Sequence, residues 1–205
     1  MRANGPAKAA NGPAKAANGP AKAGHYVPKI WTIGHSTRSA DEFVELLRAH
    51  GINGLADIRT IPRSRRHPHF GREALDARLQ DEAIEYRHFG ALGGLRKPRP
   101  DSPNGAWRNE AFRGYADHMM SPEFAAAVDD LLAFGEPRKV AVMCAEAVWW
   151  QCHRMLLSDA LAARDVDVQH IMSQRGASAV QPHRLTPFAQ IRPDRQVWYP
   201  GVLNS

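Results

Sequence analysis

The feature that most constrains the fold of this chain is a repeated alternation between short β-prone runs and longer segments with helical periodicity. β-prone runs occupy residues 30–33, 55–58, 84–89, 139–144 and 166–172, and amphipathic segments separate them. Strands that alternate with helices favour a parallel sheet with right-handed crossovers. We therefore predict an α/β fold, a single-domain three-layer sandwich whose mainly parallel sheet of about five strands carries helices on both faces.

The helix boundaries carry recognisable capping residues. Ser39 is followed three positions later by Glu42, the spacing of a capping box, and Gly51 stands where that helix should stop. Ser121 and Pro122 form an N-cap followed by proline at the first helical position. The sequence thus predicts helices between these signals and over residues 72–82, 111–119, 121–135 and 152–164.

The chain begins with a low-complexity segment that differs from the rest. Residues 4–24 repeat a seven-residue Asn-Gly-Pro-Ala-Lys pattern without large apolar side chains, so residues 1–28 are predicted to form a disordered basic tail. That tail holds four basic residues and no acid, and subtracting four from the formal charge of +6 leaves +2 for the remaining residues. We predict an α/β domain over 29–180 and an extended C-terminal strap over 181–205.

Composition bounds the setting of the protein. Hydrophobic residues make up 43% and charged residues 23%, so a sizeable core can form. No apolar run approaches the roughly 20 residues of a membrane span, and no secretory signal is visible. Two cysteines are too few to form a disulfide framework, and free cysteines are typical of a reducing compartment. We expect a cytoplasmic protein with no membrane partner and no cofactor.

Polar and glycine residues follow successive strands at the point where each strand ends. Ligands of open parallel sheets bind beyond the carboxyl ends of the strands, so residues that gather there predict a binding site. Gly34, His35 and Ser36 follow the first predicted strand, and Asp57 and Arg59 close the second. His88, Gly93 and Gly94 follow the third strand and are expected at the same edge. Cys144 and Glu146, at the end of the fourth strand, are expected there too.

The cysteines mark the sharpest chemical feature. Cys144 ends a strand, and Cys152 precedes His153 and Arg154 at the start of a helix, whose free N–H groups lower a thiol pKa. We expect Cys144 to be the catalytic nucleophile or redox thiol, with Glu146 and His153 as acid–base or orienting groups. The alternatives are a buried structural role for Cys144 and a structural or helper role for Cys152.

Residues 59–72 contain five arginines and two histidines without an acid. Arginine suits phosphates and carboxylates, which predicts an anionic or phosphate-bearing ligand, although pairing with acids of the neighbouring helices is the alternative. An arginine in the first turn of a helix, as at position 154, predicts a negative partner such as Glu146 or a ligand. The expected substrate-binding residues are His35, Ser36, Asp57, Arg59, Arg63, Arg65, Cys152 and Arg154.

Several of these motifs occur together in a known family. Over roughly residues 29–200 the chain resembles the family called domain of unknown function 488, which implies a compact α/β fold without specifying an activity. The resemblance also supports a shared site at the strand ends. It rests on the motifs TIGHST at 32–37, DIRTIPRSR at 57–65, LGG at 92–94, WRN at 107–109, FRGY at 112–115, MCAE at 143–146 and CHR at 152–154.

The sequence leaves three functions open. The first is an enzyme with a cysteine-centred, anion-binding active site, as in a thiol-dependent transferase, hydrolase or redox enzyme. The second is a nucleic-acid-binding or processing module that uses the arginine-rich loop 59–72. The third is a metal site on Cys144, Glu146, Cys152 and His153, whose spacing matches no common zinc motif.

Overall fold

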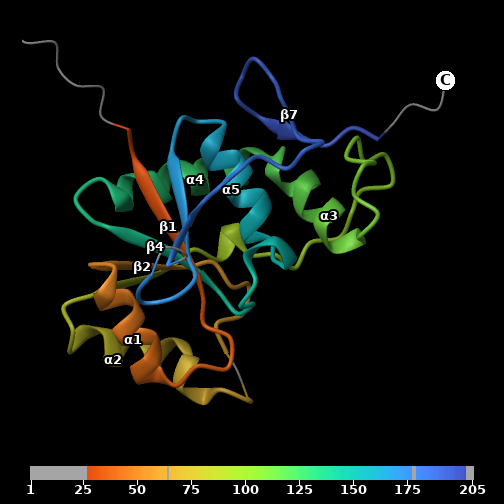
Figure 1. The fold of residues 1–205 in the computed structure, drawn as a ribbon. Helices are drawn as coiled ribbons and strands as arrows, with labels where there is room; N and C mark the ends of the chain where they lie inside the picture. The colour runs from red at the N-terminus through yellow and green to blue at the C-terminus, as the bar shows by residue number, and fades with distance from the viewer. Residues whose placement is uncertain (1–26, 64, 177–178, 202–205) are drawn as a thin grey trace, which may run out of the picture.

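The computed structural model describes residues 27–63, 65–176 and 179–201, so the repeat segment lies outside the described residues. Its main sheet has six strands in the order β3-β2-β4-β1-β5-β6 (Figure 1). The first five strands in this order pair in parallel, whereas β6 is antiparallel to β5. The strands are β1 (Lys29–Gly34), β2 (Gly54–Asp57), β3 (Glu85–His88), β4 (Val140–Cys144), β5 (Asp167–Ile171) and β6 (Val180–Pro182).

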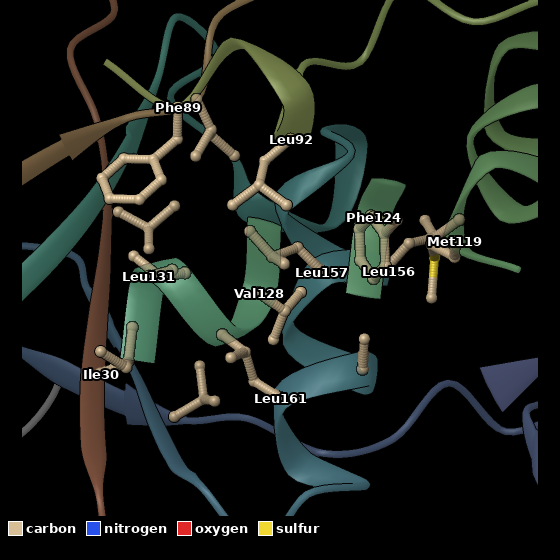
Figure 2. Packing of buried hydrophobic residues seen from close by; sticks show 14 of the residues in the cluster. Ile30, Phe89, Leu92, Met119, Phe124, Val128, Leu131, Leu156, Leu157 and Leu161 are labelled. Atoms are coloured by element: carbon tan, nitrogen blue, oxygen red, sulfur yellow. The ribbon is translucent and has the colours of Figure 1, made fainter. Parts of the chain in front are cut away.

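Helices cover both faces of the sheet, which confirms the predicted α/β sandwich. One face packs against α1 and α2, and the other packs against α3, α4 and α5 (Figures 1 and 2). None of the helices in the described part of the chain has the length and apolarity that crossing a membrane demands. The helices are α1 (Ala40–Ala49), α2 (Arg72–Gln80), α3 (Glu110–Met119), α4 (Pro122–Gly135) and α5 (Arg154–Ala162), with 3-10 turns at Pro68–Phe70, Gly90–Leu92 and Trp149–Gln151.

The capping signals of α1 act as the sequence predicts. The Ser39 side chain accepts a hydrogen bond from the backbone N–H of Glu42, and the Glu42 carboxylate accepts one from the Ser39 N–H. The helix ends at Ala49, and Gly51 adopts φ +63°, a left-handed conformation that favours glycine. Local sequence therefore determines both ends of this helix.

The strand register aligns the loops that could carry chemistry. Gly34 at the end of β1 pairs with Cys144 at the end of β4, and Asp57 at the end of β2 pairs with Met143. All five residues of β4 are buried, as expected for a central parallel strand that is apolar on both faces. The segments that follow β1, β2 and β4 consequently leave the sheet at the same edge.

The C-terminal strap is more regular than predicted. The sequence indicated a last strand near residue 172 and an extended segment after it, yet β6 pairs with β5 and two further short strands, β7 (Gln190–Ile191) and β8 (Val197–Trp198), pair with each other. These strands span only two or three residues, too few to show a period in the sequence. The expectation that residues 166–172 form the last strand was therefore wrong.

A buried carboxylate anchors this strap to the core. Asp159 of α5 is fully buried and accepts hydrogen bonds from His183 Nε2 at 2.9 Å, the Thr186 backbone N–H at 3.0 Å and Tyr199 Oη at 2.8 Å. A buried carboxylate is costly unless its oxygens are satisfied, and here all three donors come from the strap. The strap thus completes the core rather than lying loosely on it.

We predict that Asp159→Ala lowers the free energy of unfolding by about 3 kcal/mol, because it leaves buried donors without an acceptor. Tyr199→Phe removes a single donor and should cost about 1 kcal/mol. Urea unfolding measures both values. The control is Asp129→Ala, which removes an exposed partner of Arg164 and should change stability by less than about 1 kcal/mol. Equal losses for the Asp159 and Asp129 variants would refute the anchoring role.

Candidate active site

A cavity of about 640 Å³ opens at the carboxyl edge of the sheet. The loops after β1, β2 and β4 line it, together with the starts of α3 and α5. Of the predicted site residues, Asp57, Arg65 and Arg154 do not line the cavity. The others do: His35, Ser36, Arg59, Arg63, Cys144, Glu146, Cys152 and His153.

Both cysteines meet one histidine at this cavity. His153 Nδ1 lies 3.8 Å from Cys144 Sγ and 3.6 Å from Cys152 Sγ, and the three atoms all lie within 4.8 Å of one another. The backbone N–H of Arg154, in the first turn of α5, points at Cys152 Sγ over 3.5 Å. We call Cys144, Cys152 and His153 the thiol cluster.

The pKa values of the two thiols shift in opposite directions. The interaction between the two thiol groups raises the pKa of Cys144 and lowers the pKa of Cys152, whereas burial opposes ionisation of both. His153 and the positive charge of Arg154 lower the pKa of Cys152 further. Cys152 therefore holds the more acidic thiol of the pair.

Arg154 supports the loop after β4 from below. The sequence suggested that this arginine pairs with the Glu146 carboxylate or with a ligand, but its Nη2 donates to the backbone carbonyl oxygens of Glu146 and Ala147. Its Nη1 lies 3.5 Å from Thr32 Oγ1, and only 1% of the residue is exposed. Arg154 therefore lies beneath the site, and the Glu146 side chain is exposed.

Glycine at the end of β1 permits this arrangement. A Cβ atom on Gly34 would lie 1.8 Å from the carbonyl oxygen of Glu146, so any side chain there would displace the loop. Gly94 plays a similar part on the opposite wall, where an added Cβ would lie 2.4 Å from His153 Nδ1. Close approach of the loop backbone at Gly34, and of the His153 ring at Gly94, leaves no room for a side chain at either position.

A second set of contacts, which the sequence reasoning missed, holds the same loop from the side. Trp149 stacks on His170 of β5 with ring centroids 4.0 Å apart and planes at 8°. His170 Nδ1 lies 2.7 Å from Thr32 Oγ1, and its Nε2 lies 3.1 Å from Nδ1 of His183 in the strap. Nothing in the local sequence around Trp149 indicates a partner so distant along the chain.

Arg59 and Asp57 form a buried ion pair at the end of β2. Arg59 Nε and Nη2 donate to the Asp57 carboxylate over 2.9 and 2.6 Å, and Tyr86 Oη donates to the same carboxylate over 2.7 Å. Arg59 Nη1 lies 3.4 Å from His35 Nε2 at the cavity. Asp57 therefore orients Arg59, and it does not line the cavity itself.

The cavity rim carries further arginines. Arg63 and Arg66 line the cavity with exposed side chains, whereas Arg65 is exposed but lies off the cavity. Within residues 27–63, 65–176 and 179–201, neither Arg63 nor Arg66 has an ion-pair partner. The suggested pairing with acids of neighbouring helices is thus not seen for these two, and both can attract an anion.

His35 forms the wall opposite the thiol cluster. Its ring stacks on Phe70 with centroids 4.1 Å apart, and its Nδ1 lies 3.0 Å from the Ser36 carbonyl oxygen. Burial and the nearby Arg59 lower the pKa of His35 to about 4. The imidazole is therefore neutral at neutral pH, and its Nε2 faces Arg59 as an acceptor.

The His35 pKa predicts a pH dependence of stability. An unfolded chain binds this proton near pH 6.5 and the folded chain only near pH 4, so stability present above about pH 6.5 falls as the pH drops toward 4. His170, whose pKa burial lowers to about 3, contributes in the same direction. Urea unfolding measures how much the free energy of unfolding drops between pH 7 and pH 4.5. This drop should be smaller by about 2 kcal/mol in His35→Asn than in the wild type. An unchanged loss would contradict the buried neutral imidazole.

Comparison with known proteins links this site to a family. The family described as Domain of unknown function DUF488 matches residues 39–161, more than half of the chain. The matched range includes Arg59, Cys144 and Cys152 but not His35. Searches of curated proteins and of solved structures gave no match. The chain belongs to the family of proteins described as Domain of unknown function DUF488.

Proposed function

We propose that the protein is a thiolate-dependent enzyme that acts on a small anionic substrate in the 640 Å³ cavity. The observation that carries this proposal is the convergence of two thiols and one imidazole within 4.8 Å at a cavity lined by Arg63 and Arg66, which have no ion-pair partner among the described residues. A thiolate is the reactive form of cysteine, and basic rim residues bring an anion toward it. A cavity of this volume suits a small molecule.

Cys152 is the nucleophile in this proposal. Its sulfur receives the Arg154 N–H at the start of α5, the Cys144 thiol hydrogen and the His153 imidazole, so a negative charge there is stabilised from three directions. This assignment differs from the sequence-based expectation that Cys144 attacks, because the pKa of Cys152 is lowered whereas the pKa of Cys144 is raised. Cys144 becomes the donor that keeps its neighbour ionised.

The other cavity residues take supporting roles. Arg59, oriented by Asp57, and the exposed Arg63 contact the anionic part of the substrate. His153 carries a proton between the sulfurs and the substrate, since its Nδ1 is the closest base to both thiols among the described residues. Glu146 lines the mouth of the cavity with an exposed carboxylate and serves as an acid–base group for the leaving part of the substrate.

We do not adopt the nucleic-acid alternative for the arginine-rich loop. Arg59 is buried with its Nη1 directed at His35 in the cavity, and Arg63 and Arg66 line the same concave cavity. Proteins that track a nucleic-acid backbone instead present a continuous basic groove with aromatic stacking platforms. The charge distribution therefore favours a small anion.

A metal site is the second candidate function, because the interatomic distances fit one. In a tetrahedral zinc site with Zn–S of about 2.3 Å and Zn–N of about 2.0 Å, a sulfur and a nitrogen ligand lie about 3.5 Å apart. His153 Nδ1 lies 3.6 and 3.8 Å from the two sulfurs. The group within reach is Cys144, Cys152 and His153, without the Glu146 that the sequence included. Three ligands would leave the fourth position for a water or substrate.

The thiolate proposal predicts the pH profile of alkylation. An ordinary cysteine reacts with iodoacetamide with a midpoint near about pH 8.5, whereas Cys152 should react with a lower midpoint. Cys144→Ala removes the donated hydrogen bond and should move the midpoint upward. Intact-mass spectrometry with peptide mapping follows the rate and the site. Preferential labelling of Cys144, or an ordinary midpoint for Cys152, would refute the assignment.

Zinc titration of the reduced protein tests the second candidate. A metal centre predicts one tightly bound zinc per chain, lost in Cys144→Ser and in His153→Ala and retained in the matched surface variant Glu146→Gln. Calorimetry and elemental analysis measure the stoichiometry. If zinc does not bind, or if all three variants bind it equally, the thiol cluster is not a metal site and the thiolate proposal alone stands.

A further inference from the structure

The donor that stabilises the Cys152 sulfur is itself a thiol. Backbone N–H groups or a hydroxyl would be sufficient to stabilise a single nucleophilic thiolate. Instead, both cysteines of the chain lie in the thiol cluster, with the sulfurs within 4.8 Å of each other, and both line the cavity. A second thiol in this position can attack any sulfur bound to the first one.

We propose that Cys144 is a resolving cysteine, and that the substrate is an anionic molecule carrying a divalent-sulfur electrophile such as a disulfide. This inference rests on the proposed function, because it takes Cys152 as the attacking thiolate. It goes further by naming the reaction as thiol–disulfide exchange and by giving the Cys144 thiol a chemical role of its own.

The exchange balances in two steps. In the first, the Cys152 thiolate attacks one sulfur of the substrate disulfide, forms a mixed disulfide and expels the other sulfur with its electron pair as a thiolate, which takes a proton. In the second, Cys144 gives up its proton, attacks Cys152 Sγ, forms the Cys144–Cys152 disulfide and expels the second substrate thiol. Two cysteine thiols are oxidised and one substrate disulfide is reduced, and a low-molecular-weight thiol restores the dithiol.

Proton transfer in the second step has a suitable base. The mixed disulfide removes the negative charge from Cys152, so Cys144 can then lose its proton without placing two thiolates side by side. His153 Nδ1 lies 3.8 Å from Cys144 Sγ and can accept the proton as Cys144 attacks. Because Arg154 lies beneath the cluster, its positive charge then favours a thiolate on Cys144.

The cavity rim selects the charge of the substrate. Arg63 and Arg66 line the cavity and have no ion-pair partner in the described part of the chain, and Arg59 Nη1 reaches the His35 wall. A disulfide flanked by carboxylates, such as glutathione disulfide, matches this charge, whereas a cationic disulfide such as cystamine is repelled. Electrostatic selection of this kind should weaken at high salt.

Glutathione disulfide is the probe for the test, added to the reduced full-length protein with EDTA present so that no metal blocks the sulfurs. We expect the wild-type chain to lose two hydrogens in mass and both free thiols, giving a Cys144–Cys152 disulfide on peptide mapping. Cys144→Ser and Cys144→Ala should instead accumulate one glutathionyl group on Cys152. Cys152→Ser should react at least tenfold more slowly, and circular dichroism verifies that each variant folds.

Charge controls accompany the same measurement. Arg66→Ala should slow the first step with glutathione disulfide without changing the product, and cystamine should react more slowly than glutathione disulfide with the wild type. A matched control is Arg65→Ala, an exposed arginine of the same loop that lies off the cavity and should leave the rate unchanged.

The outcomes separate this inference from the proposed function. If the wild-type chain keeps a stable mixed disulfide at Cys152, or reacts with cystamine as fast as with glutathione disulfide, the inference fails, and the alkylation test then decides the proposed function separately. If Cys152 also shows an ordinary alkylation profile, the proposed function fails as well. Formation of the internal disulfide together with trapping in both Cys144 variants supports the resolving role.

Discussion

The site depends on one buried cation, the guanidinium of Arg154. A charged group is expensive to bury unless opposite charge or strong acceptors surround it, and no carboxylate in the described part of the chain pairs with this one. Its partners are two loop carbonyl oxygens, and its Nε has no hydrogen-bond partner among the described residues. The negative charge that we assign to Cys152 compensates this cation, so the loop conformation and the ionisation of the thiol support each other.

Much of the fold could be predicted because local sequence patterns determine it. The capping box at Ser39, the apolar run of β4 and the gathering of polar residues at strand ends each depend on neighbours within a few positions. The two-residue strands of the strap offered no such pattern. Most of the predicted site residues also line the cavity, because parallel strands bring their carboxyl ends to one edge.

The details of the site escaped prediction for a different reason. Residue types do not reveal a side chain that donates to backbone carbonyl oxygens, as Arg154 does. The sequence therefore suggested the Glu146 carboxylate as its partner, whereas the partner is the Glu146 backbone carbonyl oxygen. Which cysteine holds the more acidic thiol depends on distances to His153 and to the start of α5. Trp149 and His170 lie in segments that are far apart in the sequence, and the local sequence of neither residue predicts their contact.

The absence of a side chain at Gly34 has a mechanical consequence. Because β1 meets the loop after β4 backbone against backbone, that loop rests directly on the most rigid part of the molecule and has no compressible layer beneath it. Any opening that admits or releases a ligand therefore falls to the opposite wall, where Ile61, Arg63 and Arg66 are exposed. The two sulfurs therefore lie on the wall that packs directly against the sheet, whereas the exposed arginines lie at the rim of the cavity.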